Sequence, residues 1–335
     1  MPHNAADMAA RFSVAPMMDW TDRHCRVFHR QFSEYALLYT EMVTAPAVVH
    51  GDRDRLLAHD EIEHPLALQL GGSDPAQLAE ATRIACGYGF DEINLNIGCP
   101  SDRVQSGTFG AILMREPDLV ARCVEAMIAA SDGPEITVKS RIGVDEQIPE
   151  IVLPDFLRKV SGAGVKRFAI HARKAWLQGL SPKENRDVPP LDYPLVYAMR
   201  DAFPDLHLSI NGGIQTLDEV HRHLAKGMDG VMIGRAAYHE PASVLGAADP
   251  EVFGKGQVTT AEEAVDAMRP YIAAHLAAGG KLAQVTRHML GAFAGRPGAR
   301  GWRRVLSQNA HRDGAGPEVL DAALAHIADP HRLAG

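Results

Sequence analysis

Short apolar runs rich in β-branched residues alternate, up to about residue 245, with segments whose apolar residues repeat at helical spacing. This alternation is typical of a parallel sheet whose strands are joined by helices. Eight such runs fit a closed (β/α)₈ TIM barrel better than an open doubly wound sheet, which stays as the alternative. No GxGxxG follows the first run, which weakens a Rossmann interpretation. The runs are 12–17, 36–42, 66–72, 92–100, 135–143, 167–173, 207–214 and 230–238.

The helical segments between these runs carry recognisable end signals. In 74–89, Asp74 is placed to cap the helix and Pro75 occupies its first position. In 216–227, Thr216 is followed three residues later by Glu219, and a glycine closes the segment. The pattern therefore predicts helices at these positions, and another at 116–131.

The pattern changes after about residue 245, where strand-like runs stop. Glycine and proline breaks separate four helical segments at 259–280, 282–294, 298–310 and 317–329. We therefore expect a small C-terminal helical bundle attached to the barrel. The expected division is a disordered tail over 1–11, a catalytic barrel over 12–248 and a helical domain over 249–335.

Composition and charge limit the function classes. The 335 residues are 46% hydrophobic and 23% charged, with four cysteines, which is too few for a disulfide framework and favours a cytoplasmic protein. No signal peptide, membrane segment or obligate protein partner is predicted. The net charge of −8 argues against a protein coated with nucleic acid, yet no Asp or Glu lies between Asp266 and Asp313, a stretch with eight Lys and Arg residues. That stretch indicates either a local polyanion site or a solvated helix face.

Polar residues recur where the predicted strands end, which is where barrel enzymes place their active sites. Each has an ordinary structural explanation alone, but their recurrence at one end of consecutive strands favours a site. These residues are Gln69, Asn94, Asn96, Cys99, Lys139, Arg141, His171 and Arg173.

The last two strands indicate a phosphate-bearing ligand. Asn211-Gly212-Gly213 ends the seventh run and Gly234-Arg235 lies in the eighth. Glycines let backbone N–H groups approach a phosphate, and an arginine supplies charge and paired donors.

Lys139 fits either a Schiff-base lysine or a positive charge beside a flavin ring. Pro16, Met17 and Gln69 suit a flat ring better than a sugar. No metal site is expected.

The cysteines divide into two groups. Cys25, Cys86 and Cys123 fall in predicted helices and are assigned structural roles. Cys99 follows a strand end and precedes a glycine-containing loop, which makes it a candidate acid or nucleophile.

At these positions the sequence resembles the tRNA-dihydrouridine synthase family over nearly its whole length. The most specific motifs are NLNIGCPSDRVQSGTFGA (94–111) and IHARKAWLQGLSPKENR (170–186). The second, with PPLDY (189–193), is most similar to the bacterial A subfamily, which is understood to modify uridines 20 and 20a in the tRNA D-loop. Further agreement comes from APMMDWTD (15–22), LQLGG (68–72), VKSRIG (138–143), INGG (210–213) and IGRAAY (233–238).

The resemblance implies specific roles for the candidate residues. It implies an FMN site, with NADPH as reductant, and makes Cys99 the proton donor to the uracil ring. The implied tRNA contacts are Asn96, Lys183 and Arg186, with Arg300 and Arg303 on the C-terminal helices. The implied FMN ligands are Pro16, Met17, Gln69, Lys139, His171, Asn211, Gly212, Gly213, Gly234 and Arg235.

The implied reaction is reduction of the uridine C5=C6 bond in tRNA. Hydride from reduced flavin would reach C6, and a thiol has suitable acidity to protonate C5. The base would have to leave the folded RNA to reach the ring. The alternatives that stay open are a flavin barrel reductase of a free pyrimidine or other small molecule, an aldolase using Lys139, and a non-catalytic RNA-binding module.

Overall fold

Eight parallel strands form a closed barrel in the order of the chain, in a computed structural model that describes residues 8–100 and 109–327. The expected TIM barrel is therefore confirmed, and each of the eight predicted runs overlaps one strand. The strands are β1 (Phe12–Val14), β2 (Leu37–Thr44), β3 (Leu66–Gly71), β4 (Glu92–Ile97), β5 (Glu135–Arg141), β6 (Arg167–His171), β7 (His207–Asn211) and β8 (Gly230–Ile233).

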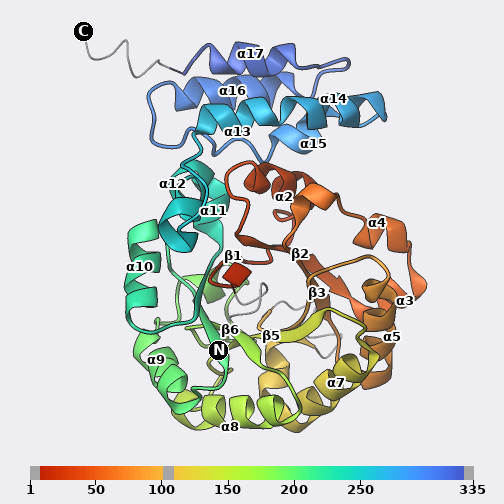
Figure 1. Cartoon of the computed structure of the whole chain (residues 1–335), viewed down its shortest axis with the longest axis vertical. Helices are drawn as coiled ribbons and strands as arrows, with labels where there is room; N and C mark the ends of the chain where they lie inside the picture. The colour runs from red at the N-terminus through yellow and green to blue at the C-terminus, as the bar shows by residue number, and fades with distance from the viewer. Residues whose placement is uncertain (1–7, 101–108, 328–335) are drawn as a thin grey trace. The chain divides into compact units, whose positions relative to one another are not determined.

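Helices surround the strands as an outer ring (Figure 1). The predicted end signals act as expected in α5, where the Asp74 side chain accepts a hydrogen bond from Gln77 N and Pro75 is the first helical residue. None of the described helices is both long and apolar enough to cross a bilayer. The ring and its short turns comprise α3 (Ala45–His50), α4 (Arg53–Leu57), η1 (Glu61–Glu63), α5 (Pro75–Cys86), η2 (Gly110–Arg115), α7 (Pro117–Ala130), α8 (Pro149–Gly162), η3 (Glu184–Arg186), α9 (Tyr193–Ala202) and α10 (Leu217–Ala225).

The barrel interior contains small apolar residues and an unusual number of buried polar ones. Ala67, Ala169 and Met232 belong to one buried cluster inside the barrel. Arg167 is 4% exposed and lies 3.2 Å from the Glu92 carboxylate, with Glu135 at 2.5 Å. A charge removed from water is stable only with such partners, so this ion pair is an integral part of the core.

Residues 8–11, which were expected to belong to a disordered N-terminal tail, are ordered. Met8–Arg11 form a turn closed by a 3.2 Å bond from Arg11 N to Met8 O. Ala10 is only 3% exposed and joins the cluster inside the barrel. The turn is ordered because it buries this apolar side chain directly before β1.

The chain divides into two compact units, and the second is discontinuous in sequence. The barrel unit comprises 1–18, 37–214 and 218–234, and the helical unit comprises 19–36, 215–217 and 235–335. The segment between β1 and β2 thus belongs to the helical unit. The functional division at residue 248 stays a proposal. The helical unit contains α2 (Arg23–Arg30), α11 (Arg235–His239), α12 (Pro241–Leu245), η4 (Asp249–Phe253), α13 (Ala261–Ala267), α14 (Arg269–Ala277), α15 (Leu282–Thr286), α16 (Ala299–Asn309) and α17 (Glu318–Leu324).

The C-terminal helices lie within the predicted segments, with one helix divided and one shortened. The helix expected over 282–294 ends at Thr286, and turns follow it. The segment expected as a single helix over 259–280 breaks at Met268 into α13 and α14. Pro270 stands in the first turn of α14, where its missing N–H costs least, so the proline begins a new helix there. Trp302 of α16 is fully buried, and its indole N–H donates to Met289 O at 3.0 Å.

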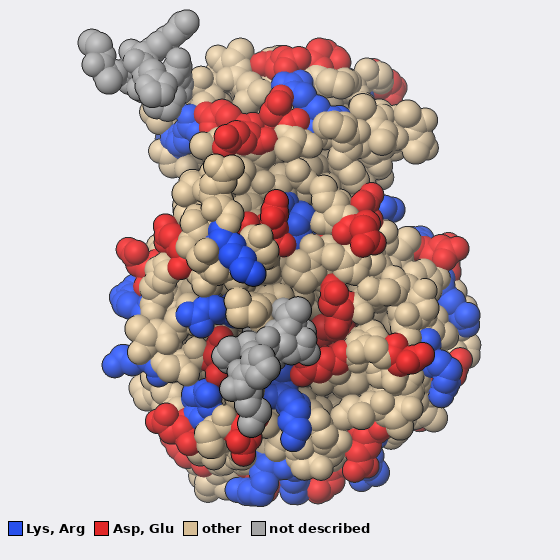
Figure 2. Space-filling model, in the orientation of Figure 1, with Lys and Arg blue, Asp and Glu red and all other residues tan. Residues whose placement is uncertain are grey.

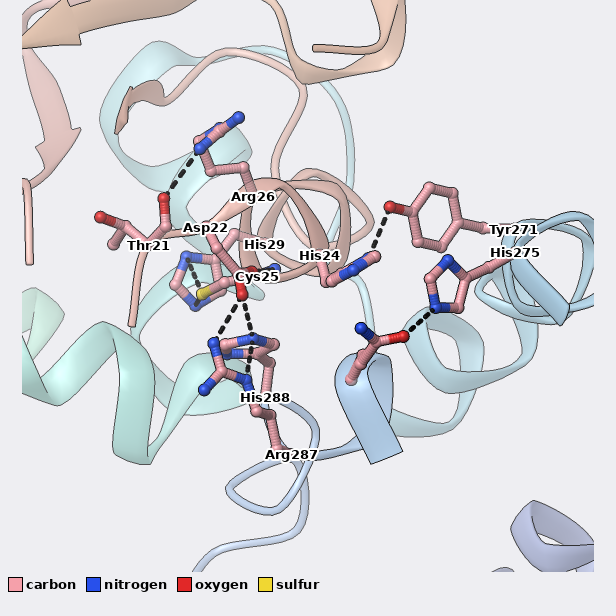
Figure 3. Close-up of polar contacts among 11 residues, drawn as sticks. Thr21, Asp22, His24, Cys25, Arg26, His29, Tyr271, His275, Arg287 and His288 are labelled. Atoms are coloured by element: carbon pink, nitrogen blue, oxygen red, sulfur yellow. Dashed lines mark hydrogen bonds and ion pairs between the residues drawn. The ribbon is translucent and has the colours of Figure 1, made fainter. Parts of the chain in front are cut away.

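Asp22 joins α2 to the rest of the helical unit (Figure 3). Its side chain caps α2 at Cys25 N, and its Oδ2 lies 2.6 Å from Arg287 Nη2 and 3.0 Å from His288 Nε2. Burial alone would raise the pKa of this carboxyl, but its contacts with His288 and Arg287 outweigh that effect and the net pKa lies well below the usual range. Asp22 therefore stays ionised while it holds these segments together.

His29 makes the helical unit sensitive to acid. Burial, then the nearby charges of His288 and Arg30, lower the pKa of His29 to about 3. Because this folded-state pKa lies below the unfolded value of about 6.5, the unfolded chain binds the proton first as pH falls. The stability that neutral His29 contributes is complete above pH ~6.5 and is lost from there towards about pH 3.

We therefore expect His29→Gln to flatten the acid side of the stability curve. The slope of the unfolding free energy between pH 6 and 4, measured by urea denaturation, should fall by up to about 1.4 kcal/mol per pH unit. His50→Gln, which replaces an exposed histidine, is the matched control and should leave the slope as in the parent protein. An unchanged slope in His29→Gln would contradict the assignment.

Candidate active site

Polar side chains meet at the carboxyl ends of β4, β5 and β6. Strand register sets Asn96 opposite Lys139, and Arg141 opposite His171. Arg141 is 3% exposed, and His171 and Asn96 are each 9% exposed. The sequence therefore predicted correctly that these residues share one end of the barrel.

The charges in this cluster shift one another. Burial, then the guanidinium of Arg141, lowers the pKa of Lys139 to about 7, while Cys99 acts in the opposite direction. Burial lowers the pKa of His171 well below its usual range, and Arg141 and Lys139 add to the effect. Burial also lowers the pKa of Arg141, to about 10. An anion brought beside Lys139 would raise the pKa of its amine again, so the site is suited to a negatively charged ligand.

Asn211 and two glycines form the end of β7. The Lys139 amine donates to Asn211 Oδ1 at 3.2 Å, and Asn211 Nδ2 donates to Met232 O at 2.8 Å. Gly212 and Gly213 have φ of +112° and +72°, a region that favours glycine. A Cβ on Gly212 would lie 2.5 Å from the His171 ring. The His171 ring therefore packs directly against the backbone of Gly212, which leaves no room for a side chain there.

The remaining ring-binding candidates flank β1 and β8. Pro16 and Met17 follow β1 and are half-buried. The Met17 sulfur lies 3.6 Å from the position that a Cβ of Gly234 would take. Arg235 follows Gly234 directly and opens α11. Pro16, Met17 and Gly234 thus follow the ends of the paired strands β1 and β8.

Cys99 is fixed through its backbone. Asn96 Oδ1 accepts bonds from both Gly98 N and Cys99 N, each at 2.9 Å. Cys99 O accepts from Ala111 N at 2.9 Å. The motif residues 101–108 that follow lie outside the described residues. Cys99 is half-buried and is not part of a disulfide.

The other cysteines lie away from this site. Cys25 is buried, with its sulfur 3.6 Å from His29 Nε2. Burial raises the pKa of the Cys123 thiol to about 11, which suits an inert core residue. Cys86 lies in α5, with its sulfur 3.9 Å from Ser131 Oγ.

Two buried residues, Arg141 and Asn185, hold the loop after β6, and only Asn185 was not among the candidates from the sequence. Asn185 is fully buried, and its amide bonds Trp176 N, Trp176 O and Leu180 O. Arg141 donates to Gly98 O at 3.1 Å and to Asn185 O at 2.8 Å, joining this loop to the one bearing Cys99. Arg141 was named from its place on β5, whereas Asn185 lies in a loop where the apolar pattern gives no signal.

The implied tRNA contacts lie on both units. Lys183 and Arg186 are exposed at η3, and the charge of Arg186 adds to the lowering of the pKa of His171. Arg300 and Arg303 are exposed one turn apart on α16, and within the described residues neither forms an ion pair. The basic stretch therefore contains arginines of two kinds. Arg269, Arg287 and Arg296 form ion pairs with Asp321, Asp22 and Glu262, respectively, whereas in the part of the chain that the structure describes Arg300 and Arg303 do not.

Charge of both signs is mixed over the visible face of the barrel (Figure 2). Screening limits interactions between exposed charges to about 10 Å, so a polyanion would respond to local groups rather than to the net charge of −8.

Comparison with known proteins decides the family. The family model described as dihydrouridine synthase (Dus) matches residues 13–328. The chain belongs to the dihydrouridine synthase family. It is 58% identical over 323 residues to a tRNA-dihydrouridine(20/20a) synthase of Salmonella typhi, covering 96% of each chain. It is 57% identical to the protein of that name from Escherichia coli K12, covering 96% of this chain and 92% of that protein.

Family membership makes the protein an oxidoreductase and confirms the resemblance stated from the motifs. The barrel is also similar to a solved structure, the old yellow enzyme homologue from Zymomonas mobilis. The TM-score is 0.53 at 15% identity, covering 76% of this chain and 92% of that chain. At that identity the likeness supports the barrel fold alone.

Proposed function

We propose that this dihydrouridine synthase reduces the C5=C6 bond of uridines 20 and 20a in the tRNA D-loop, using FMN and NADPH. The position specificity follows the names of relatives that are 57–58% identical over 96% of the chain. The observation that carries the chemistry is the convergence of the Cys99 backbone with Lys139 and His171 at adjacent strand ends.

The residues present fit FMN. Gly213 is exposed at the end of β7, and the backbone at Gly212 and Gly213 packs so closely against His171 and Leu191 that neither position has room for a Cβ. Arg235 adds a guanidinium for a phosphate. FMN reduced by NADPH would supply the hydride for C6. The residues proposed to hold it are Pro16, Met17, Gln69, Lys139, His171, Asn211, Gly212, Gly213, Gly234 and Arg235.

Lys139 and His171 have distinct proposed roles. Lys139, with a pKa of about 7, gains its proton when an anionic group lies beside it, and so would bind the charged edge of the ring. His171, whose burial keeps its pKa well below the usual range, stays neutral and offers one N–H and one lone pair. The pair therefore adds a single positive charge at the site.

Cys99 is the proposed acid. Negative charge builds on C5 and O4 of the uracil as hydride reaches C6, so a proton must arrive at C5. The thiol of Cys99 donates that proton while its backbone is held by Asn96. The thiol has to remain protonated until the hydride moves, which distinguishes it from a nucleophilic thiolate.

The tRNA contacts are proposed from exposed charge. A uridine must leave the folded RNA to be reduced, and the surrounding RNA must then be held by cations. Lys183 and Arg186 are exposed on the barrel unit, and Arg300 and Arg303 on the helical unit. The bond to Gln69 uses one of the two N–H groups of Asn96 Nδ2, and we propose the other for the substrate base.

The test is product mapping on a tRNA transcript. Purified protein with FMN and NADPH should form dihydrouridine at positions 20 and 20a, and free uridine at equal concentration should react far more slowly. Equal rates on free uridine would favour the small-molecule reductase instead.

Charge reversal at Arg300 should weaken tRNA binding. Arg300→Glu is expected to reduce affinity for tRNA by about tenfold at low salt and to lower the salt slope by about 1, because a phosphate contact is lost. Binding isotherms at several salt concentrations measure both quantities. FMN content should stay unchanged.

Lys226→Glu is the matched control for this charge change. Lys226 is exposed between α10 and β8, at the end of the barrel opposite the site. It should leave tRNA affinity within about twofold of the parent. If the two variants bind tRNA equally well, α16 has no role in binding.

A further inference from the structure

A continuous line of polar side chains crosses the barrel interior from its core to Cys99. Register places Gln69 opposite Asn94, and Asn94 opposite Thr137. Glu92, Asn94 and Asn96 alternate along β4, so all three point to the same face. All five side chains are buried, none more than 9% exposed.

The line begins at the Glu92 carboxylate. Its Oε1 accepts bonds from the Tyr39 and Thr137 hydroxyls, each at 2.5 Å, and its Oε2 faces Arg167 at 3.2 Å. Burial, then the charge of Glu92, raises the pKa of Tyr39 well above its usual range, so this hydroxyl keeps its proton and donates. Glu92 Oε1 therefore accepts two hydrogen bonds, and among the described residues Oε2 is held only by its ion pair with Arg167.

Donor and acceptor rules then fix every amide above it. Thr137 has one hydroxyl proton, which it gives to Glu92, so its oxygen accepts from Asn94 Nδ2 at 2.7 Å. Asn94 Oδ1 in turn accepts from Gln69 Nε2 at 2.8 Å. Gln69 Oε1 accepts from Asn96 Nδ2 at 2.7 Å. Rotating one amide alone would set two donors, or two acceptors, against each other.

The upper end of the line is the backbone that carries Cys99. With its nitrogen bonded to Gln69, Asn96 presents its oxygen to the N–H groups of Gly98 and Cys99. The orientation of that oxygen is thus set by the hydroxyl of Thr137, three side chains away. Connected buried networks of this kind specify one arrangement only when every member is satisfied.

We propose that Thr137, oriented by Glu92, is a positioning residue that fixes the Cys99 backbone through Asn94, Gln69 and Asn96. The inference rests on the proposed role of Cys99 as proton donor. Thr137 lies too deep in the barrel to contact substrate, since it is 1% exposed and its hydroxyl bonds Glu92 and Asn94, which are themselves buried. Its effect on the reaction is carried by the line of side chains.

Packing alone does not account for this arrangement. Other interior positions are occupied by Ala67, Ala169 and Met232, which need no hydrogen-bond partners. Burying a polar group without partners is costly, so five consecutive polar side chains make a demanding core. The hydrogen bonds along the line allow only one orientation of the Asn96 side-chain amide.

The test compares Thr137→Val with Thr137→Ser. Valine keeps the shape but removes the hydroxyl, which leaves Asn94 Nδ2 facing a methyl group and releases the amides above it. We expect hydrogen exchange at the Gly98 and Cys99 amides of Thr137→Val to accelerate about five- to tenfold, the effect of losing roughly one hydrogen bond. Thr137→Ser restores the hydroxyl and should return exchange to within about twofold of the parent.

Ser140→Ala is the matched control. Ser140 is buried in the same strand, three residues on, and its hydroxyl has no hydrogen-bond partner among the described residues. Its removal should leave exchange at Gly98 and Cys99 unchanged. A general loosening of β5 would instead accelerate exchange in all three variants in proportion to lost stability, and that outcome would overturn the proposal.

A second measurement connects the line to the reaction. The assay uses saturating FMN, because Gln69 belongs both to the line and to the proposed FMN ligands. In Thr137→Val, dihydrouridine formation in tRNA should then fall about fivefold or more while NADPH oxidation with an artificial acceptor is retained, because only the first needs the Cys99 proton. Exchange is measured on protein without flavin or RNA. If exchange in Thr137→Val is as slow as in the parent protein, Thr137 does not fix the Cys99 backbone. If exchange is fast but the parent protein does not reduce tRNA, the proposed function is wrong and the role of Thr137 in the fold stands.

Discussion

Cys99→Ala is expected to lower the rate of dihydrouridine formation in tRNA by about 10²–10⁴-fold, the usual contribution of a positioned acid. Flavin content and NADPH oxidation by an artificial acceptor should be retained, because neither step needs a proton from this thiol. The rates are measured by single-turnover reactions on an unmodified transcript. A small side chain at residue 99 keeps the backbone bonds to Asn96, so the loss reports the thiol itself.

Cys86→Ala is the control for this prediction. Cys86 is half-buried like Cys99, but it lies on α5 in the outer ring, with its sulfur near Ser131. It should modify tRNA at the parent rate. Should Cys99→Ala also reduce tRNA at the parent rate, the thiol is not the acid and the proposed mechanism is wrong.

Gly212→Ala is expected to have the second largest effect, on flavin binding. A Cβ at this position lies 2.5 Å from the His171 ring, and the φ of +112° is strained for alanine. The His171 ring would have to move out of the position proposed to face FMN. We expect FMN affinity to fall about tenfold to a hundredfold, since displacements and strain of this kind cost roughly 1–3 kcal/mol. Fluorescence titration of the apoprotein with FMN measures the change.

Gly133→Ala separates the clash from the backbone strain. Gly133 has a similar φ of +117°, but a Cβ there would meet nothing within 4 Å. It lies before β5, at the end of the barrel away from the site. This variant should lose stability and keep its FMN affinity. Equal losses of affinity in both variants would show that strain, rather than the region around His171, controls binding.

The sequence predicted the barrel from signals of two kinds. Apolar runs marked the strands, and residues such as Asp74 and Pro75 marked a helix start that the structure reproduces. The strand ends then identified Lys139 and His171, since parallel strands bring their carboxyl ends together. Their roles toward FMN remain a proposal.

Other features depended on contacts that periodicity does not encode. Pro270 was read within one helix, whereas it begins a second one. The segment after β1 was assigned to the barrel, whereas Asp22 binds it to Arg287 and His288, which lie more than 260 residues along the chain. Such partners become visible only when the chain is folded.

Thr137 illustrates the limit for functional residues. A single threonine in an apolar strand gives no signal of its own. Its hydroxyl matters because Glu92 and Asn94 meet it from the neighbouring strand, in a register that the sequence leaves open. The alternation of Glu92, Asn94 and Asn96 was the visible sign that polar groups point into the barrel.

The central claim is that the strand ends of this barrel hold a flavin that reduces uridine in tRNA. The most direct measurement is anaerobic: protein reconstituted with FMN is reduced by NADPH, freed of excess NADPH, and mixed with an unmodified transcript while the flavin spectrum is followed. The account predicts that tRNA reoxidises the flavin, with one dihydrouridine formed at position 20 or 20a for each flavin oxidised. Protein that cannot bind FMN, or bound flavin that tRNA leaves reduced, would contradict it.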